Sequence, residues 1–292
     1  MNISPKERYL DICHFKRLGD MWLRDSLPEV TLKNWVAQGA PSEIVKNPRF
    51  CREYFQFERS SGLVEIRASS YGGGDEETVT PEIDLGCGIT MRGGGGPVVP
   101  AYESRIISMD EHTVTLIDGA GRTRKSLKED IIKGDIKTRG WSMSMYLDWQ
   151  VKDRATWNEH KKRLDPNTPE RWPSDWNTYV QKMNGKSEPL SLPVGGFYGE
   201  LREWVGSERI LYMFHDDPGL IEDMMEQMLY LETEVIKRVL KDIKVQQATF
   251  WEDMCYKAGP LISPAMVRKF MMPRYKKITD LLHSYGVDVI YL

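Results

Sequence analysis

The feature that most constrains the fold is an alternation of apolar strands and long helices in the last third of the chain. Apolar strand patterns begin at residue 190, lie within 246–253 and return at 287–292. Two long helical patterns, at 219–244 and 262–286, separate them. This β–α–β–α–β order favours a parallel sheet or a barrel, because parallel strands need long crossover connections and are buried by the helices between them.

The two helical patterns also predict their own ends and buried faces. In the first, apolar residues recur at helical spacing at Leu220, Met224, Met228, Leu231, Val235, Val239 and Ile243. We expect the Met-rich face to be core, and Asp216 or Asp217 to cap this helix. In the second, Ser263 is the expected N-cap and Gly286 the stop, and the internal Pro273 should kink the helix.

A different pattern occupies residues 62–127. Short alternating runs are separated there by turn signals at Asp110-Glu111 and Asp118-Gly119. This predicts an antiparallel β meander that is inserted into, or lies on the rim of, a single domain spanning 1–292.

Composition excludes several classes of protein. The 40 Lys and Arg residues nearly balance the 43 Asp and Glu residues, and a net charge of −3 argues against binding nucleic acid or a membrane surface through charge. No apolar run approaches the roughly 18–20 residues of a membrane span. The four cysteines, at 13, 51, 87 and 255, form no CxxC pair, so we expect a reducing, cytoplasmic location and no disulfide framework.

The turn after the first apolar strand, 195–199, is one candidate site. Its glycines either allow a ligand to approach the backbone or simply make a tight turn. The turn matches neither GxGxxG nor GK[ST], so nucleotide binding has little support.

The second strand ends in two carboxylates, Glu252 and Asp253, which point to opposite faces if the strand is regular. One of them is expected to be functional, because the apolar residues before the pair suit an acid with a raised pKa. The other would cap the next helix or pair with Lys257. The candidate site residues are Glu252 and Asp253 as catalytic groups and, for substrate binding, Phe197, Tyr198, Trp251, Lys257 and Tyr291.

With these residues in view, the chain resembles the uroporphyrinogen decarboxylase superfamily. The similar segments are 192–206 and 250–292, and 258–278 carries the most specific part: a turn, a Ser-Pro helix start and a Phe-x-x-Pro kink. The resemblance also includes 151–166 and covers about 149–292 well. It implies a (β/α)8 TIM-type barrel with its active site at the carboxyl mouth, and either porphyrinogen decarboxylation or corrinoid-linked methyl transfer.

The chain departs from the decarboxylases of this family at the motif that binds substrate. Those enzymes use an arginine-rich N-terminal segment, whereas the corresponding stretch here, 20–35, contains only Arg24. A tetrapyrrole with eight carboxylates needs several clustered cations. The related methyltransferases use a His-x-Cys motif on the strand after the kinked helix to bind zinc, and that position falls at or beyond Leu292. We therefore assign no metal ligand.

The leading hypothesis is methyl transfer that involves a small methylated substrate or a corrinoid protein. Zinc would take part if its ligands follow Leu292. The first alternative is decarboxylation of a porphyrinogen or another carboxylated substrate, and the second is a non-catalytic binding protein on the same barrel. Because a closed barrel needs more strands than these, we also expect the 292 residues to be an incomplete barrel that lacks roughly a hundred residues.

Overall fold

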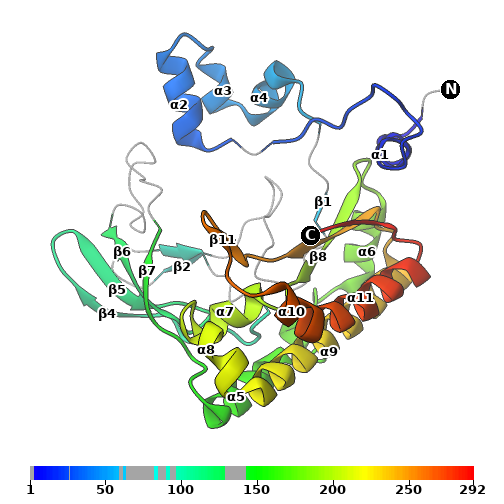
Figure 1. Ribbon diagram of the computed structural model, residues 1–292. Coiled ribbons are helices and arrows are strands. Elements are labelled where there is room, and N and C mark those ends of the chain that lie inside the picture. The colour runs from blue at the N-terminus through cyan, green and yellow to red at the C-terminus, as the bar shows by residue number, and fades with distance from the viewer. Residues whose placement is uncertain are drawn as a thin grey trace.

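The protein has a mixed α/β fold in which the parallel and the antiparallel strands form separate sheets (Figure 1). The structure is a computed structural model. It describes residues 3–25, 27–58, 62–63, 82–84, 90–92, 97–128 and 143–292.

The predicted parallel pairing is confirmed. Strands β1 (Gly62–Leu63), β8 (Leu190–Gly195), β9 (Gln247–Trp251) and β12 (Val289–Tyr291) lie in the order β1-β8-β9-β12, and each neighbouring pair is parallel. The register places Gly195 opposite Trp251. The chain therefore leaves β8 and β9 at the same edge of the sheet, which places the 195–199 turn beside Glu252 and Asp253.

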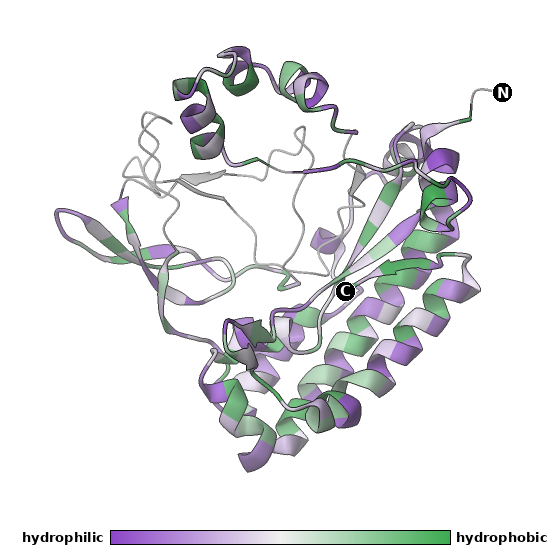
Figure 2. Ribbon diagram, turned by 45° about the horizontal axis from the view of Figure 1, so that its top comes forward, coloured by the Kyte–Doolittle hydropathy of each residue, from purple (hydrophilic) through white to green (hydrophobic). Residues whose placement is uncertain are grey.

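Two helices, α9 (Pro218–Asp242) and α11 (Met272–Ser284), run side by side along this sheet (Figures 1 and 2). Their hydrophobic residues alternate with hydrophilic ones, as the two colours on these ribbons in Figure 2 show. The expected Met-rich core is confirmed, since Met224, Met225 and Met228 are fully buried.

The helix ends follow the local signals. Asp217 accepts a hydrogen bond from the Leu220 N–H at 3.0 Å and caps α9. The Ser263 hydroxyl accepts one from the Met266 N–H at 3.2 Å and caps α10 (Pro264–Met266). A π-helical turn, Val267–Met271, joins α10 to α11 just before Pro273, where the regular i→i−4 ladder is interrupted.

A second sheet is antiparallel, with strands β4 (Arg105–Met109), β5 (Thr113–Ile117), β6 (Thr123–Leu127) and β7 (Met145–Asp148) in sequential order. It extends past the expected boundary at residue 127. Strands β2 (Glu82–Asp84) and β3 (Thr90–Arg92) form a separate antiparallel pair. Residues 62–63, also expected in the meander, pair with β8 in the parallel sheet instead. Residues 64–81, 85–89 and 93–96 of the expected meander lie outside the described residues.

The remaining elements surround these two sheets. They are α1 (Pro5–Cys13), α2 (Glu29–Ala37), α3 (Glu43–Lys46), α4 (Pro48–Phe55), α5 (Arg154–Lys161), α6 (Trp176–Asn184), α7 (Gly199–Val205), α8 (Arg209–Asp216), the 3-10 turns Lys162–Leu164 and Pro169–Arg171, and the hairpin β10 (Cys255–Tyr256) and β11 (Gly259–Pro260). No helix in the described part of the chain combines the length and the apolar composition that crossing a bilayer requires.

Helix α1 connects the N-terminal segment to strands β9 and β12 of the parallel sheet. The Tyr9 hydroxyl donates to the side-chain oxygen of Gln247, and it lies 3.3 Å from the Tyr291 hydroxyl. His14 Nε2 lies 3.0 Å from an Asp288 carboxylate oxygen. The two ends of the described chain are thus in direct contact.

The expected (β/α)8 barrel is wrong for this structure. The parallel sheet, as far as it is described, has four strands and does not close, and the strands at 105–148 pair in their own antiparallel sheet. The reason is that a β–α–β pattern determines pairing between neighbouring strands. Closure depends on strand number, tilt and shear, which no local pattern encodes.

Candidate functional site

The carboxyl edge of the parallel sheet brings the two sequence-predicted segments together. A Cβ at Gly196 would overlap the Trp251 carbonyl oxygen, and one at Gly199 would lie 3.0 Å from the Trp251 ring. Strand β9 itself therefore occupies the space that the missing side chains leave. The sequence left two interpretations of this turn, the approach of a ligand to the glycines or a tight turn. The structure supports the tight turn.

Glu252 lies underneath this turn with both carboxylate oxygens occupied. Oε1 accepts hydrogen bonds from the N–H groups of Phe197 and Tyr198, at 2.6 and 3.1 Å, and from the Tyr275 hydroxyl. Oε2 accepts one from the Gly199 N–H at 2.7 Å. The carboxylate thus satisfies backbone donors at the start of α7 that the helix cannot pair internally.

Two effects act in opposite directions on the Glu252 carboxyl group. Burial raises its pKa above the ordinary value, while the bonds from Tyr275 and the three backbone N–H groups oppose that rise. The same contacts keep the oxygens away from a substrate. The geometry therefore gives Glu252 a positioning role.

Asp253 has the opposite environment, with its side chain 51% exposed. Arg202, from α7, donates from one Nη1 atom to both the Asp253 carboxylate, at 2.7 Å, and the Asp253 backbone carbonyl, at 2.9 Å. The guanidinium also lies 5.9 Å from the centre of the Trp251 ring. Asp253 is therefore a fixed carboxylate with an open side, next to a partly exposed aromatic ring.

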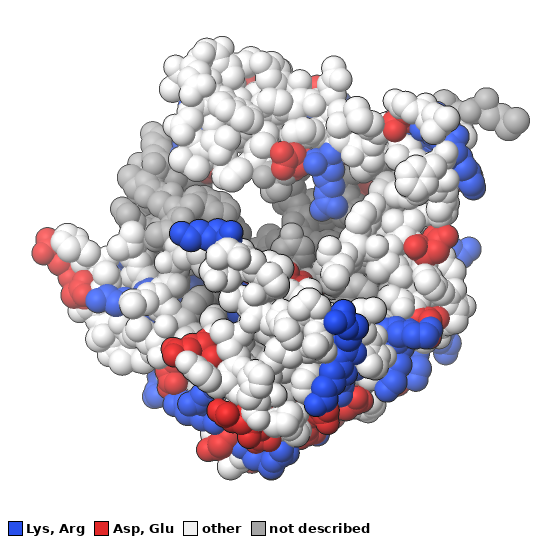
Figure 3. All heavy atoms as spheres, in the orientation of Figure 1, with Lys and Arg blue, Asp and Glu red and all other residues white. Residues whose placement is uncertain are grey.

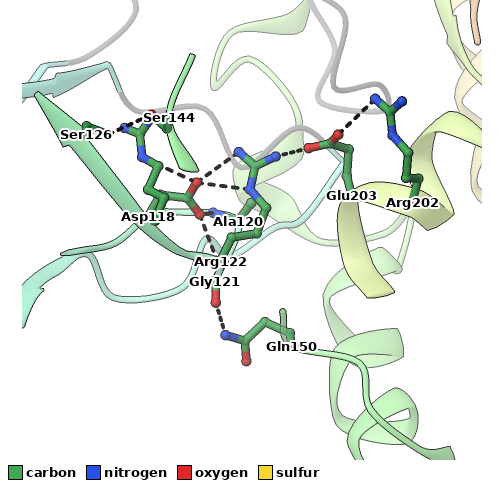
Figure 4. A network of polar contacts seen from close by, with 10 residues as sticks. Asp118, Ala120, Gly121, Arg122, Ser126, Ser144, Gln150, Arg202 and Glu203 are labelled. Carbon is green, nitrogen blue, oxygen red and sulfur yellow. Dashed lines mark hydrogen bonds and ion pairs between the residues drawn. The ribbon is translucent and has the colours of Figure 1, made fainter. Parts of the chain in front are cut away.

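A chain of alternating charges links this edge to the antiparallel sheet (Figure 4). Asp118 pairs with Arg122 at 2.9 Å, and Arg122 pairs with Glu203. Glu203 lies 3.4 Å from Arg202, which pairs with Asp253. The side chains of Arg122 and Arg202 are both mostly buried, at 17% and 15% exposure, so this network fixes the antiparallel sheet against α7.

Phe197 and Tyr198, expected to wall a pocket, are fully buried instead. Phe197 packs edge-on against Tyr275 with ring centres 5.0 Å apart, and Tyr198 stacks on Phe214 at 6.4 Å. The Tyr198 hydroxyl has no hydrogen-bond partner among the described residues. These two residues are core in the structure, and Trp251 is the more accessible aromatic residue at this edge.

The other two expected binding residues have different neighbours. Lys257 is exposed in the turn between β10 and β11. Tyr291 contacts Tyr9 and lies 3.7 Å from the Cys13 sulfur. Among the described residues, neither side chain makes a hydrogen bond or ion pair with Glu252 or Asp253.

A second carboxyl group, that of Glu232, supports the 195–199 turn. It was not among the residues expected from the sequence. Glu232, on α9, is completely buried, and its Oε1 accepts a hydrogen bond from the Gly195 N–H at 2.7 Å. Its Oε2 has no partner among the described residues, and burial raises the pKa of this group well above its ordinary value. The signal was available: Glu232 lies four residues after Met228 and three before Val235, inside the apolar stripe.

Arg202, Arg122 and Tyr275 were also missed. Each contacts a residue far away in the chain, as in the Tyr275–Glu252 bond across 23 residues and the Arg122–Glu203 pair across 81. An arginine one turn into the helix after a sheet-edge glycine turn is the one local signal that could have indicated Arg202.

The described residues do not form a metal centre. They contain no group of three or more His, Cys, Asp or Glu side chains placed to hold an ion. Cys13, Cys51 and Cys255 are free thiols. The zinc that the resemblance implies thus has no ligand set in this part of the chain, and no chemical step is assigned to it.

No family model and no curated protein matches this chain. The resemblance to the uroporphyrinogen decarboxylase superfamily therefore stays an expectation that rests on residues 151–166, 192–206 and 250–292 alone.

Proposed function

We propose that this protein is a methyl-transfer enzyme related to the uroporphyrinogen decarboxylase superfamily. It would move a methyl group between a small methylated compound, or a corrinoid protein, and an acceptor. The resembling segments, 192–206 and 250–292, include the 195–199 turn and the Glu252–Asp253 pair that meet at the carboxyl edge of the parallel sheet. Ligand sites of parallel α/β sheets lie at this edge.

The pairing of Arg202 is the observation that favours methyl transfer over porphyrinogen decarboxylation. Its guanidinium is engaged by Asp253 at 2.7 Å and by Glu203 at 3.4 Å. A porphyrinogen with many carboxylates needs guanidinium groups that are free to bind them. At the described part of this edge, Arg202 is committed to the protein's own carboxylates, which favours a small substrate over a polycarboxylate.

Four residues have separate roles in this proposal. The open side of Asp253 orients the substrate or accepts a proton from it, and Arg202 holds that carboxylate in place. Trp251 offers a flat apolar wall beside it. Glu252 fixes the turn through its backbone contacts and does not touch the substrate.

A cytoplasmic location belongs to the same proposal. The described cysteines Cys13, Cys51 and Cys255 are all free thiols. Free thiols persist in a reducing compartment.

The test is methyl exchange by the full chain, measured with methylcobalamin, a partner corrinoid protein and a panel of methylated substrates and thiol acceptors. We expect turnover that the Asp253→Asn variant loses and that Asp280→Asn, at an exposed α11 ion pair with Lys276, retains. Turnover of uroporphyrinogen in place of methyl exchange would support the decarboxylase alternative. No turnover on any substrate, with partners in a pull-down unchanged by Glu252→Ala and Asp253→Ala, would support a binding protein.

A further inference from the structure

A cleft of about 760 Å³ lies away from the carboxyl-edge site, where the β7–α5 connection, the α7–α8 turn and the α8–α9 corner meet. In Figure 1 these elements lie at the lower left of the molecule, and Figure 3 shows acidic and basic side chains together along this lower edge. Its volume falls within the range of small-molecule pockets. None of the residues 195–199 or 251–253 lines it.

The apolar part of the cleft is built around Trp149. A Cβ at Gly206, where φ is +94°, would lie 2.9 Å from the indole ring, so glycine is needed there for the ring to pack on the α7–α8 turn. Val205 and Leu220, each 2% exposed, form part of the floor. Tyr212 also lines the cleft and is 60% exposed, so its ring is available to a ligand.

The charged part of the lining is negative, with five carboxylates and three cations. The cations are engaged within the protein. Lys152 pairs with Asp148 at 2.7 Å, and Arg154 lies 3.6 Å from Asp217. The third cation, Arg209, donates to a backbone carbonyl at 3.5 Å.

The side chains of two lining carboxylates have no partner among the described residues. Asp153 and Asp217 cap α5 and α9, whereas the carboxylates of Glu208 and Asp216 make no hydrogen bond or ion pair within the part of the chain that the structure describes. They lie at the two ends of α8 (Arg209–Asp216), which forms one wall. The cleft thus combines unneutralised negative charge with exposed aromatic surface.

We propose that this cleft binds a small organic cation, an ammonium group on an apolar body. The cationic group would be attracted by Glu208 and Asp216, and the apolar body would contact Trp149 and Tyr212. Carboxylates and aromatic faces together favour such cations over neutral molecules of the same shape. This site does not depend on the proposed methyl transfer.

The experiment is calorimetric titration of the full chain with choline, phenethylammonium and benzyltrimethylammonium. The neutral isostere of choline, 3,3-dimethyl-1-butanol, is the matched control ligand. We expect at least one cation to bind, choline to bind roughly tenfold or more tightly than its isostere, and added salt to weaken the binding. Failure of all three cations to bind, or equal affinity for choline and its isostere, overturns the proposal.

Variants then test the location. Glu208→Gln combined with Asp216→Asn should weaken binding at least tenfold, and Tyr212→Ala should weaken it without altering charge. The control is Glu222→Gln, which removes one exposed charge from α9 outside the cleft lining. Unchanged binding in both cleft variants, with circular dichroism showing that they are folded, would contradict this location. If the double variant does not fold, Tyr212→Ala and the isostere comparison decide the question.

Discussion

The N–H of Phe197 donates to the Glu252 carboxylate at 2.6 Å, across 55 residues of chain. The N–H groups of Tyr198 and Gly199 donate to the same carboxylate. The glycine turn, the start of α7 and the end of β9 are thus held together by the carboxylate of Glu252. Its neighbour Asp253 is left on the accessible side.

Glu252→Gln should destabilise the protein by roughly 2 to 3 kcal/mol, because the amide nitrogen would face backbone donors that then lack an acceptor. Urea unfolding followed by circular dichroism measures this loss. The matched control is Glu234→Gln, at a half-exposed pair with Lys237, where we expect about 0.5 kcal/mol or less. Equal losses in the two variants would contradict the role given to Glu252.

Asp253→Asn should leave the fold intact and reduce turnover. Its pair with Arg202 is half-exposed on the aspartate side, so the stability change should stay within about 1 kcal/mol. If Asp253 accepts a proton, the methyl-transfer rate should fall by roughly 10²- to 10⁴-fold. A variant with wild-type rate and wild-type melting temperature would remove Asp253 from the mechanism.

Glu232→Gln should change how stability depends on pH. Burial keeps the Glu232 carboxyl protonated above its ordinary pKa of 4.5, so folding takes up a proton and wild-type stability falls as the pH rises past 4.5. The glutamine retains an acceptor for the Gly195 N–H but cannot ionise. Urea unfolding at pH 5, 6.5 and 8 should show the variant gaining stability relative to the wild type as the pH rises. Parallel pH profiles would show that Glu232 is ionised in the folded protein.

His160 should remain neutral far below its usual range. It is fully buried, its Nδ1 lies 2.9 Å from the Tyr102 hydroxyl, and burial lowers its pKa from 6.5 to about 3. As the pH falls, His160 is protonated in the unfolded chain before it is protonated in the folded protein. The contribution of neutral His160 to the free energy of unfolding is therefore complete above pH 6.5. This contribution is lost at roughly 1.4 kcal/mol per pH unit as the pH falls from 6.5 toward 3.

Proton NMR of the imidazole C2–H signals tests this directly. The His160 signal should not shift between pH 8 and 5, because burial keeps the imidazole neutral over this range. A His160 midpoint near 6.5 would contradict the burial seen in the structure.

The features predicted correctly from the sequence are those that depend on neighbouring residues. Apolar spacing predicted α9, the Ser-Pro signal predicted the start of α10, and an aspartate cap before the long helix was found at Asp217. Each depends on residues within a few turns of one another, where spacing and capping chemistry act directly. Barrel closure was not predictable in this way, because open and closed parallel sheets share the same local pattern.

In the candidate site, too, the features set by neighbouring residues were predicted and those set by distant contacts were not. Glu252 and Asp253 were located because they follow a buried strand, but their different roles depend on contacts with residues 51 to 55 positions away. Phe197 and Tyr198 were expected to line a pocket, but both are buried in the core, where Phe197 packs against the ring of Tyr275. Tertiary contacts of this kind leave no periodic signal in the chain.

The contacts of Tyr9 have a consequence for the order of events during protein synthesis. Its hydroxyl bonds to Gln247, 238 residues later, and approaches Tyr291, 282 residues later. A ribosome that adds about 5 to 20 residues per second needs roughly 15 to 60 s to extend the chain from Tyr9 to Tyr291. Helix α1 is therefore synthesised well before the strands that it contacts, and it can dock only once both strands have been made. In the interval the Tyr9 side chain lacks the partners that bury it in the folded protein.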